Sequence, residues 1–95
     1  NAGIHSHFAM PVSFLRLGDV KDYVKVITTN GTIITKQSIS SVEAMLPERK
    51  FIRTHRSYIV GTGHIKSYTS ELIEIRDTEI PIGKLFRNEV LKLLN

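Results

Sequence analysis

Short runs of apolar residues, broken every few positions by glycine, proline or polar pairs, recur along most of the chain. Runs of this length that are rich in valine, isoleucine, threonine and tyrosine are typical of β-strands. Their positions predict strands at 13–17, 23–29, 32–37, 51–60 with an interruption at 55–57, 65–69, 71–75 and 79–82. This number of short strands indicates a mainly β domain, most simply a sandwich.

One β-hairpin is predicted in detail, because Asn30-Gly31 lies between two β-branched runs. This dipeptide is the strongest short-range signal for a two-residue type I′ turn. Such a turn would place Lys25 opposite Lys36 on the two strands. Both faces of the hairpin carry apolar side chains, so we expect both to be partly covered.

Two segments have helical spacing instead. Ser40 and Glu43 fit a capping box, and the apolar residues that follow end at Pro47, which predicts a helix over 41–46. The helical pattern from 84 to 94 is longer, and its apolar stripe consists of Phe86, Val90, Leu93 and Leu94.

The chain has 95 residues, enough for one domain with a modest core. We expect residues 1–10 to be a poorly ordered leader or tag-proximal segment and 11–95 to form the domain. The chain contains no cysteine, which excludes disulfides, zinc–thiolate sites and a thiol nucleophile. No apolar run reaches the ~18 residues of a membrane-spanning helix, so we expect a cytoplasmic protein without a membrane partner.

Charge is distributed unevenly along the chain. Thirteen Lys and Arg residues outnumber nine Asp and Glu residues, which gives a net charge of +4. Residues 49–66 hold five of the cations and no acid, whereas residues 71–79 hold four acids and one arginine. The basic stretch is either an ordinary solvated face or the binding surface for an anionic partner.

Two cationic pairs conflict with local rules of stability. Lys25 and Lys36 would repel each other across the predicted hairpin by up to ~1 kcal/mol. Lys84 and Arg87 would lie in the first turn of the last helix, where the helix dipole disfavours cations. A polyanion would relieve both conflicts, and a helix start of this kind also suits a phosphate group.

Patterns that indicate catalysis are missing. The chain has no Walker-type glycine loop, no HExxH zinc motif and no paired cysteines. His55 and Ser57 are too close in sequence to align as a nucleophile–base pair on one strand, and no aspartate is placed to orient them. We therefore expect no enzyme activity, no cofactor and no metal site.

The segment 51–60, F-I-R-T-H-R-S-Y-I-V, resembles the pattern F-x-R-x-H-R-S-(Y/F)-x-V of the LytTR DNA-binding domains of bacterial response regulators. Three further segments resemble family motifs: D-Y-V-K-V at 22–26, the L-P that ends the first helix, and I-P-I-G-K at 80–84. The similarity extends over roughly residues 14–94 in the order that the family has. The central motif is specific, and the whole set is more so.

The resemblance implies a fold: an elongated antiparallel β-sandwich of small stacked sheets, with one short internal helix and one C-terminal helix. It also implies sequence-specific binding of double-stranded DNA, as the output domain of a two-component transcriptional regulator whose loops enter successive major grooves. The implied partners are duplex DNA, a second protomer on direct-repeat sites, and a receiver domain in the full-length chain.

Three loops carry the base contacts in the family, and the resemblance places them here at Lys21-Asp22, His55-Arg56 and Gly83-Lys84. In the last pair, Gly-Lys stands where the family usually has Ser-Arg. Lysine lacks the fork of donors that arginine presents to guanine. We therefore expect Lys84 to contact phosphate, or to read a base only weakly.

Arg56 is the strongest candidate for reading a base, and the alternative is a salt bridge to Glu43 or Glu48. His55 would either contact DNA or hold its loop through a backbone hydrogen bond. Arg53 occupies an outward position of its strand and would face phosphate or simply solvent. The other candidates would contact phosphate without specificity, with a turn-forming role as the alternative for the serine: Ser57, Lys25, Lys36 and Arg87.

A protein-interaction module is the alternative function, in which a β-sandwich docks an acidic protein through its basic patch. Binding of single-stranded RNA is disfavoured, because it needs exposed aromatic residues for stacking. Phe and Tyr make up only 7% of this chain and mostly occupy core-like positions.

Overall fold

The computed structural model describes residues 12–18 and 22–95, which form two antiparallel sheets and two α-helices. The larger sheet has the strand order β3-β2-β1-β5-β4 and consists of β1 (Val12–Leu17), β2 (Val24–Thr28), β3 (Gly31–Thr35), β4 (Phe51–His55) and β5 (Tyr58–Gly61). The smaller sheet consists of β6 (Ser67–Tyr68), β7 (Leu72–Ile75) and β8 (Thr78–Pro81). The helices are α2 (Ile39–Met45) and α3 (Arg87–Leu94), and a short 3-10 helix, η1 (Thr62–His64), follows β5.

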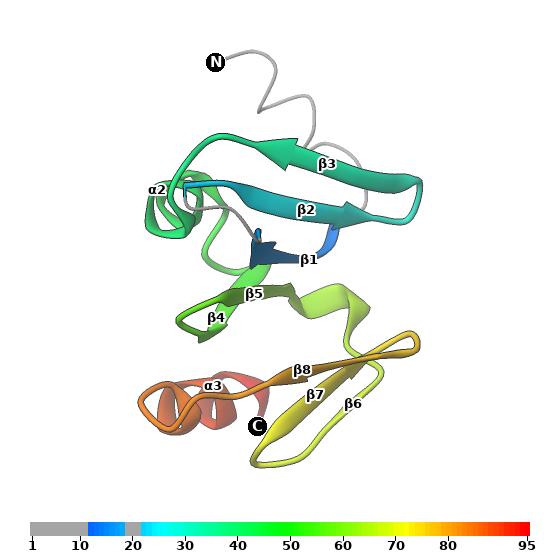
Figure 1. The fold of residues 1–95 in the computed structure, drawn as a ribbon. Coiled ribbons are helices and arrows are strands. Elements are labelled where there is room, and N and C mark those ends of the chain that lie inside the picture. Colours follow the sequence, from blue (N-terminus) through cyan, green and yellow to red (C-terminus); the bar gives the residue numbers. More distant parts are fainter. Residues whose placement is uncertain (1–11, 19–21) are drawn as a thin grey trace.

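The larger sheet lies above the smaller sheet and α3 in the view of Figure 1. Each face of the larger sheet packs on an apolar cluster. Val24 and Val26 of β2 pack on one face with residues of α2. Ile27 points to the other face, where the smaller sheet and α3 complete the second cluster. The molecule measures 34 × 24 × 23 Å. The expected elongated, mainly β sandwich of stacked sheets with two helices is confirmed.

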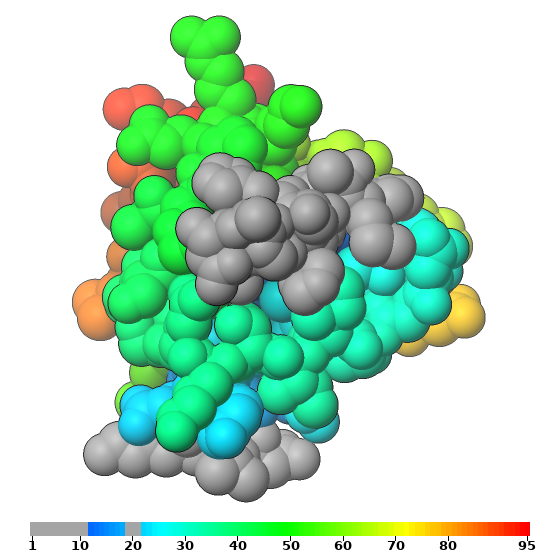
Figure 2. Space-filling view, turned by 90° about the horizontal axis from the view of Figure 1, so that it is seen from above, coloured from blue at the N-terminus to red at the C-terminus, as the bar shows by residue number. Residues whose placement is uncertain are grey.

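Both helices lie at the same end of the molecule as the β4–β5 turn, and the β7–β8 turn lies at the opposite end (Figure 1). The segment that leads from β8 into α3 also reaches the helical end. Seen from above, α2 and the segment that follows it run along one side, and the β2–β3 hairpin lies along the other (Figure 2). The sheets therefore bring the central sequence motif and the start of α3 to a common end.

The predicted register of the β2–β3 hairpin is wrong by two residues. Lys25 pairs with Ile34, so the predicted lysine pair does not form. The turn falls at 29–30, and Gly31, with a φ of 140°, already begins β3. The Thr28 hydroxyl donates to the Gly31 carbonyl (2.8 Å) and accepts from the backbone N–H of Asn30 in the turn (3.1 Å). A shift of two residues keeps every side chain on its predicted face, so alternation is satisfied by either register.

The first helix begins two residues earlier than predicted, and its N-cap is Ser38 rather than Ser40. The Ser38 hydroxyl accepts a hydrogen bond from the Ser41 amide (3.1 Å). The earlier start brings Ile39 into the cluster between α2 and the larger sheet. Burial of this side chain stabilises the observed start. Glu43 consequently lies inside the helix and is not part of a capping box.

Candidate nucleic-acid interface

The central motif forms the β4–β5 hairpin, and Arg56-Ser57 is the turn at its tip. The pairing register shifts between Arg53 and His55, which leaves Thr54 as the extra residue of a β-bulge. A bulge bends its strand and re-aims the side chains that follow it. The bulge therefore sets the direction in which the hairpin tip leaves the sheet.

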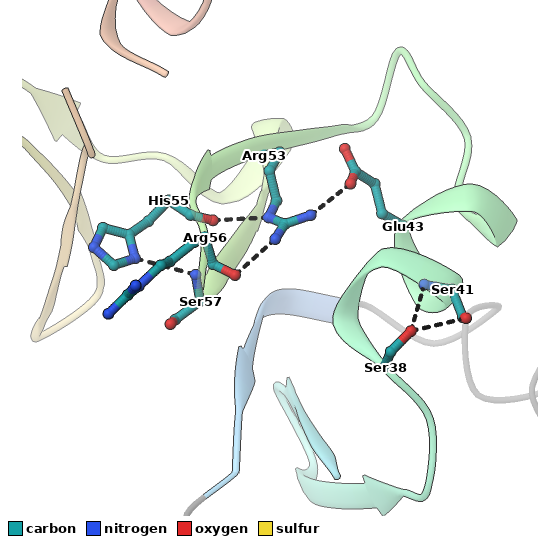
Figure 3. A network of polar contacts seen from close by, with 7 residues as sticks. All are labelled: Ser38, Ser41, Glu43, Arg53, His55, Arg56 and Ser57. Carbon is teal, nitrogen blue, oxygen red and sulfur yellow. Dashed lines mark hydrogen bonds and ion pairs between the residues drawn. The ribbon is translucent and has the colours of Figure 1, made fainter. Parts of the chain in front are cut away.

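Arg53 organises the hairpin tip (Figure 3). Its Nε donates to the His55 carbonyl (2.7 Å), and its Nη2 donates to the Arg56 carbonyl (2.6 Å). Its Nη1 forms an ion pair with Glu43 Oε1 of α2 (2.6 Å). The Arg53 side chain is only 15% exposed, so the expectation that it faces outward is wrong. The guanidinium instead ties the tip to α2.

His55 holds the same turn through its ring. The Ser57 backbone N–H donates to His55 Nδ1 (3.1 Å), and the ring meets Tyr58 edge-on with 5.7 Å between centroids. The loop-holding role considered for His55 is therefore present, with Ser57 contributing its backbone. Because Nδ1 accepts this bond, the neutral ring carries its proton on Nε2. Nε2 is thus the ring atom that can donate to a partner.

Arg56 stands at the tip with an exposed side chain. Its backbone carbonyl accepts from Arg53, while no hydrogen bond or ion pair in the described part of the chain engages its guanidinium. The salt bridges considered as alternatives, to Glu43 or Glu48, are likewise not formed among these residues, since Glu43 pairs with Arg53. Arg56 therefore presents a fork of N–H donors on a backbone that other residues hold in place.

The turn before α3 packs beside the hairpin tip. The Gly83 N–H donates to the Thr54 carbonyl (2.8 Å), and the Phe86 N–H donates to the Gly83 carbonyl (3.0 Å). A Cβ on Gly83 would lie 3.3 Å from the Phe86 ring and 3.4 Å from the His55 ring, so glycine permits this close approach. Tip and turn together line a hollow of about 160 Å³, formed by His55, Arg56, Gly83, Lys84, Leu85 and Phe86.

The last helix starts later than predicted, at Arg87, so Lys84 lies in the preceding turn and not in the first helical turn. The turn is held by Phe86, which packs on the second apolar cluster and lies 5.8 Å from the Arg53 guanidinium. Lys84 is exposed, whereas Arg87 is half-buried and its Nε lacks a partner among the described residues. The first helical turn also contains Glu89, which suits the positive end of the helix dipole.

A row of paired residues crosses the larger sheet and ends at the hairpin tip. Arg16 of β1 pairs with Lys25 of β2 and with Tyr58 of β5, and Tyr58 pairs with His55. Arg16 was not predicted as a site residue, because only the pairing of β1 with β2 and β5 places it in this row. Lys36 follows the end of β3, is exposed, and is not part of the row.

The end of β1 is joined to the hairpin tip. The Leu17 N–H at the end of β1 donates to the Ser57 carbonyl (3.0 Å). Asp22 is exposed and adopts a left-handed backbone, with a φ of 68°. Lys21, the other residue predicted for this loop, lies outside the described residues.

The cluster at the helical end offers a partner hydrogen-bond donors and positive charge. Its exposed or half-exposed groups are the Arg56 guanidinium, the Lys84 ammonium and the His55 imidazole. Within the described ranges, no three His, Asp or Glu side chains are grouped to hold a metal ion. Among the described residues, no helix is long and apolar enough to cross a membrane.

Comparison with known proteins shows close similarity in both sequence and fold. A family model described as the LytTr DNA-binding domain matches residues 11–95. A similar solved structure is the LytTr DNA-binding domain of a Bacillus cereus protein described as a methyl-accepting/DNA response regulator. It shares 30% sequence identity and a TM-score of 0.77, and the match covers 88% of this chain and 81% of that chain.

Two curated relatives are bacterial proteins. The sensory transduction protein LytT of Bacillus anthracis is 31% identical over 84 residues, which are 82% of this chain and 34% of that protein. The transcriptional regulatory protein LytR of Staphylococcus aureus (strain N315) is 28% identical over 89 residues, 87% of this chain and 36% of that protein. The chain therefore spans about a third of the length of these relatives. The match of the family model over nearly the whole chain shows that it belongs to the LytTR family of DNA-binding domains.

Proposed function

We propose that this domain binds double-stranded DNA with sequence specificity, as the output domain of a bacterial two-component transcriptional regulator. The proposal rests on the arrangement of side chains at the hairpin tip (Figure 3). Arg56 exposes its guanidinium there, while Arg53 donates to the carbonyls on either side of it. An arginine fork on a preorganised backbone is the commonest device for reading guanine in the major groove.

The surrounding groups divide into those that read a base and those that position the domain on DNA. In the proposal, Arg56 reads a base and the His55 Nε2–H donates beside it. Lys84 and Lys36 contact phosphates, which contribute affinity without sequence information. Arg53 keeps the tip in shape and does not itself touch phosphate, because each of its three side-chain nitrogens already donates to an acceptor in the protein and the side chain is only 15% exposed.

The distribution of charge supports the same orientation on DNA. Glu71, Asp77 and Glu79 are exposed on or beside the smaller sheet, and Glu74 pairs with Lys66 (3.8 Å). The β7–β8 turn lies at the end of the molecule opposite the hairpin tip (Figure 1). Asp77 belongs to that turn, so its carboxylate repels phosphate at the end of the molecule away from the exposed Arg56 and Lys84.

We extend the proposal to the assembly on DNA. The hairpin tip and the turn before α3 enter one major groove together, and the loop at Lys21-Asp22 extends the contact to a successive groove. Two protomers occupy a direct repeat, and a receiver domain belongs to the remaining part of a longer cytoplasmic protein. This extension is supported by family membership and by the chain spanning about a third of its curated relatives.

The test begins by selecting the preferred duplex from a random pool and measuring its Kd across a range of salt concentrations. Arg56→Ala should weaken binding to the selected duplex by ~1–3 kcal/mol and remove the preference at one base pair. Lys36→Ala is the matched control, because it also removes one exposed cation. It should weaken binding to all duplexes alike and lower the salt slope by about one.

Equal losses of both variants on selected and on random duplexes would show that Arg56 does not read sequence. A wild-type domain that enriches no duplex, and that is not retained on DNA at low salt, would overturn the proposed function. Retention on an acidic protein instead of DNA would favour the protein-interaction module.

A further inference from the structure

Leu85 is the most exposed large apolar side chain in the described part of the chain. It is 96% exposed, whereas Ile34 and Leu93, the next in order, are 60% and 59% exposed. Leucine is among the residues most often buried, and a fully exposed one contributes nothing to folding through burial. A single exposed leucine is ordinary on a protein surface, so its meaning depends on the groups that surround it.

The backbone on both sides of Leu85 is held in place. The Gly83 N–H bonds to the Thr54 carbonyl of β4 (2.8 Å), and the Phe86 N–H closes the turn on Gly83 (3.0 Å). Phe86 itself is anchored in the second apolar cluster and lies beside the Arg53 guanidinium. Leu85 thus projects from a turn that is tied to the sheet, next to the exposed Lys84.

Leu85 also stands beside the groups that are proposed to meet DNA. It lines the hollow of about 160 Å³ together with His55, Arg56 and Lys84. It borders a second groove of about 360 Å³ as well, and that groove also carries Glu48 and Glu89. These acids repel phosphate, so DNA reaches Leu85 from the side of the hollow.

Resting on the proposed function, we infer that Leu85 contacts the C5-methyl group of a thymine and selects thymine at a position near the base read by Arg56. The C5-methyl of thymine is the apolar group that base pairs present in the major groove. Leu85 can reach a thymine methyl group when Arg56 contacts an adjacent base and Lys84 contacts a phosphate. Lys84, a point charge without a fork, provides no such selection.

The experiment uses the duplex selected from the random pool by the wild-type domain. Each thymine of the site is replaced in turn by deoxyuridine, which removes the methyl group and keeps every hydrogen-bonding atom of the base. Kd is measured by fluorescence anisotropy for the wild type, Leu85→Ala and Lys84→Ala. Burial of one methyl group corresponds to about a fourfold change in affinity.

The wild type should lose about fourfold in affinity at one thymine in particular. Leu85→Ala should bind the unmodified duplex more weakly by a comparable factor and should no longer respond to the methyl group at that position. Lys84→Ala should bind more weakly overall and keep the wild-type response to deoxyuridine. Because Leu85 is exposed, its variant should unfold at the wild-type temperature, which a melting curve verifies.

Two results would overturn the inference while leaving DNA binding intact: a wild type that responds to no deoxyuridine, or a Leu85→Ala variant that keeps the full response. Weakened association between two protomers in Leu85→Ala, with unchanged methyl discrimination, would assign the side chain to a protein contact instead. A wild type that enriches no duplex at all would remove the proposed function and the inference together.

Discussion

Replacement of Arg53 by alanine removes the contact that joins the hairpin tip to α2 and to the turn before α3. Its bonds to the carbonyls of His55 and Arg56 contribute about 1 kcal/mol each. Its ion pair with Glu43, whose side chain is 45% exposed, contributes at most about 1 kcal/mol. The guanidinium over Phe86 adds about 0.5–1 kcal/mol. Water replaces part of the lost bonding, so we expect the free energy of unfolding to fall by about 2–3 kcal/mol.

Urea denaturation and thermal melting of purified variants measure this loss. In a domain of this size, 1 kcal/mol shifts the melting temperature by roughly 4–8 °C, so the expected shift is well resolved. Arg56→Ala is the matched control: it removes a neighbouring arginine whose side chain is exposed, and its stability should change by less than about 0.5 kcal/mol. Arg53→Lys keeps the charge but not the fork of donors, and it should be intermediate.

DNA binding separates the two arginines further. Arg53→Ala should lose sequence-specific affinity together with stability, whereas Arg56→Ala should lose specific affinity alone. If Arg53→Ala melts at the same temperature as the wild type, these four contacts do not stabilise the fold. If it melts early yet keeps full specificity on the selected duplex, Arg53 does not position the hairpin tip.

Three further predictions concern the N-cap of α2, the close packing at Gly61 of β5, and Lys84, which stands where the family usually has arginine. Ser38→Ala should lower the free energy of unfolding by ~1 kcal/mol in urea denaturation, because it removes the N-cap bond, while Ser40→Ala should leave it nearly unchanged. A larger loss in Ser40→Ala than in Ser38→Ala would show that Ser40 is the N-cap. Gly61→Ala should destabilise the fold by ~1–3 kcal/mol, because a Cβ there would lie 2.7 Å from the Val12 carbonyl of β1. Gly63→Ala is the control, since a Cβ at Gly63 would meet nothing within 4 Å. Equal melting temperatures of the two variants would contradict this packing. Lys84→Arg should add ~1 kcal/mol of preference for guanine at one base pair of the selected duplex, and an unchanged base profile would place Lys84 on phosphate alone.

Much of the candidate site was predictable because its groups are close in sequence. His55 and Arg56 are neighbours, and the charge pattern and the motif both drew attention to them. The role of Arg53 was not predictable in this way. Its partner Glu43 lies ten positions away on a helix, and the two carbonyls to which it donates follow the bulge at Thr54. The guanidinium therefore turns inward at a position that alternation assigns to the surface.

Leu85 and Arg16 escaped prediction for related reasons. Leu85 lies outside the apolar stripe of the last helix, but an isolated surface leucine is ordinary until its exposure and neighbours are known. Arg16 joins Lys25 and Tyr58 in one row only through the pairing of β1 with β2 and β5. Side chains that become neighbours across a sheet carry no mark of that proximity in their own segment.

By itself, the sequence determined the mainly β character, the face on which the residues of β2 and β3 lie, and the family of the fold. These follow from local alternation and from a motif of adjacent residues. The tertiary structure alone decided the β2–β3 register, the start of each helix, and which arginine faces a partner. The register goes with the bonds that the Thr28 hydroxyl makes within the turn, the start of α2 with burial of Ile39 against the larger sheet, and the inward orientation of Arg53 with the carboxylate of Glu43. Alternatives that look equal in the sequence differ by a few hydrogen bonds and one buried side chain, and packing selects between them.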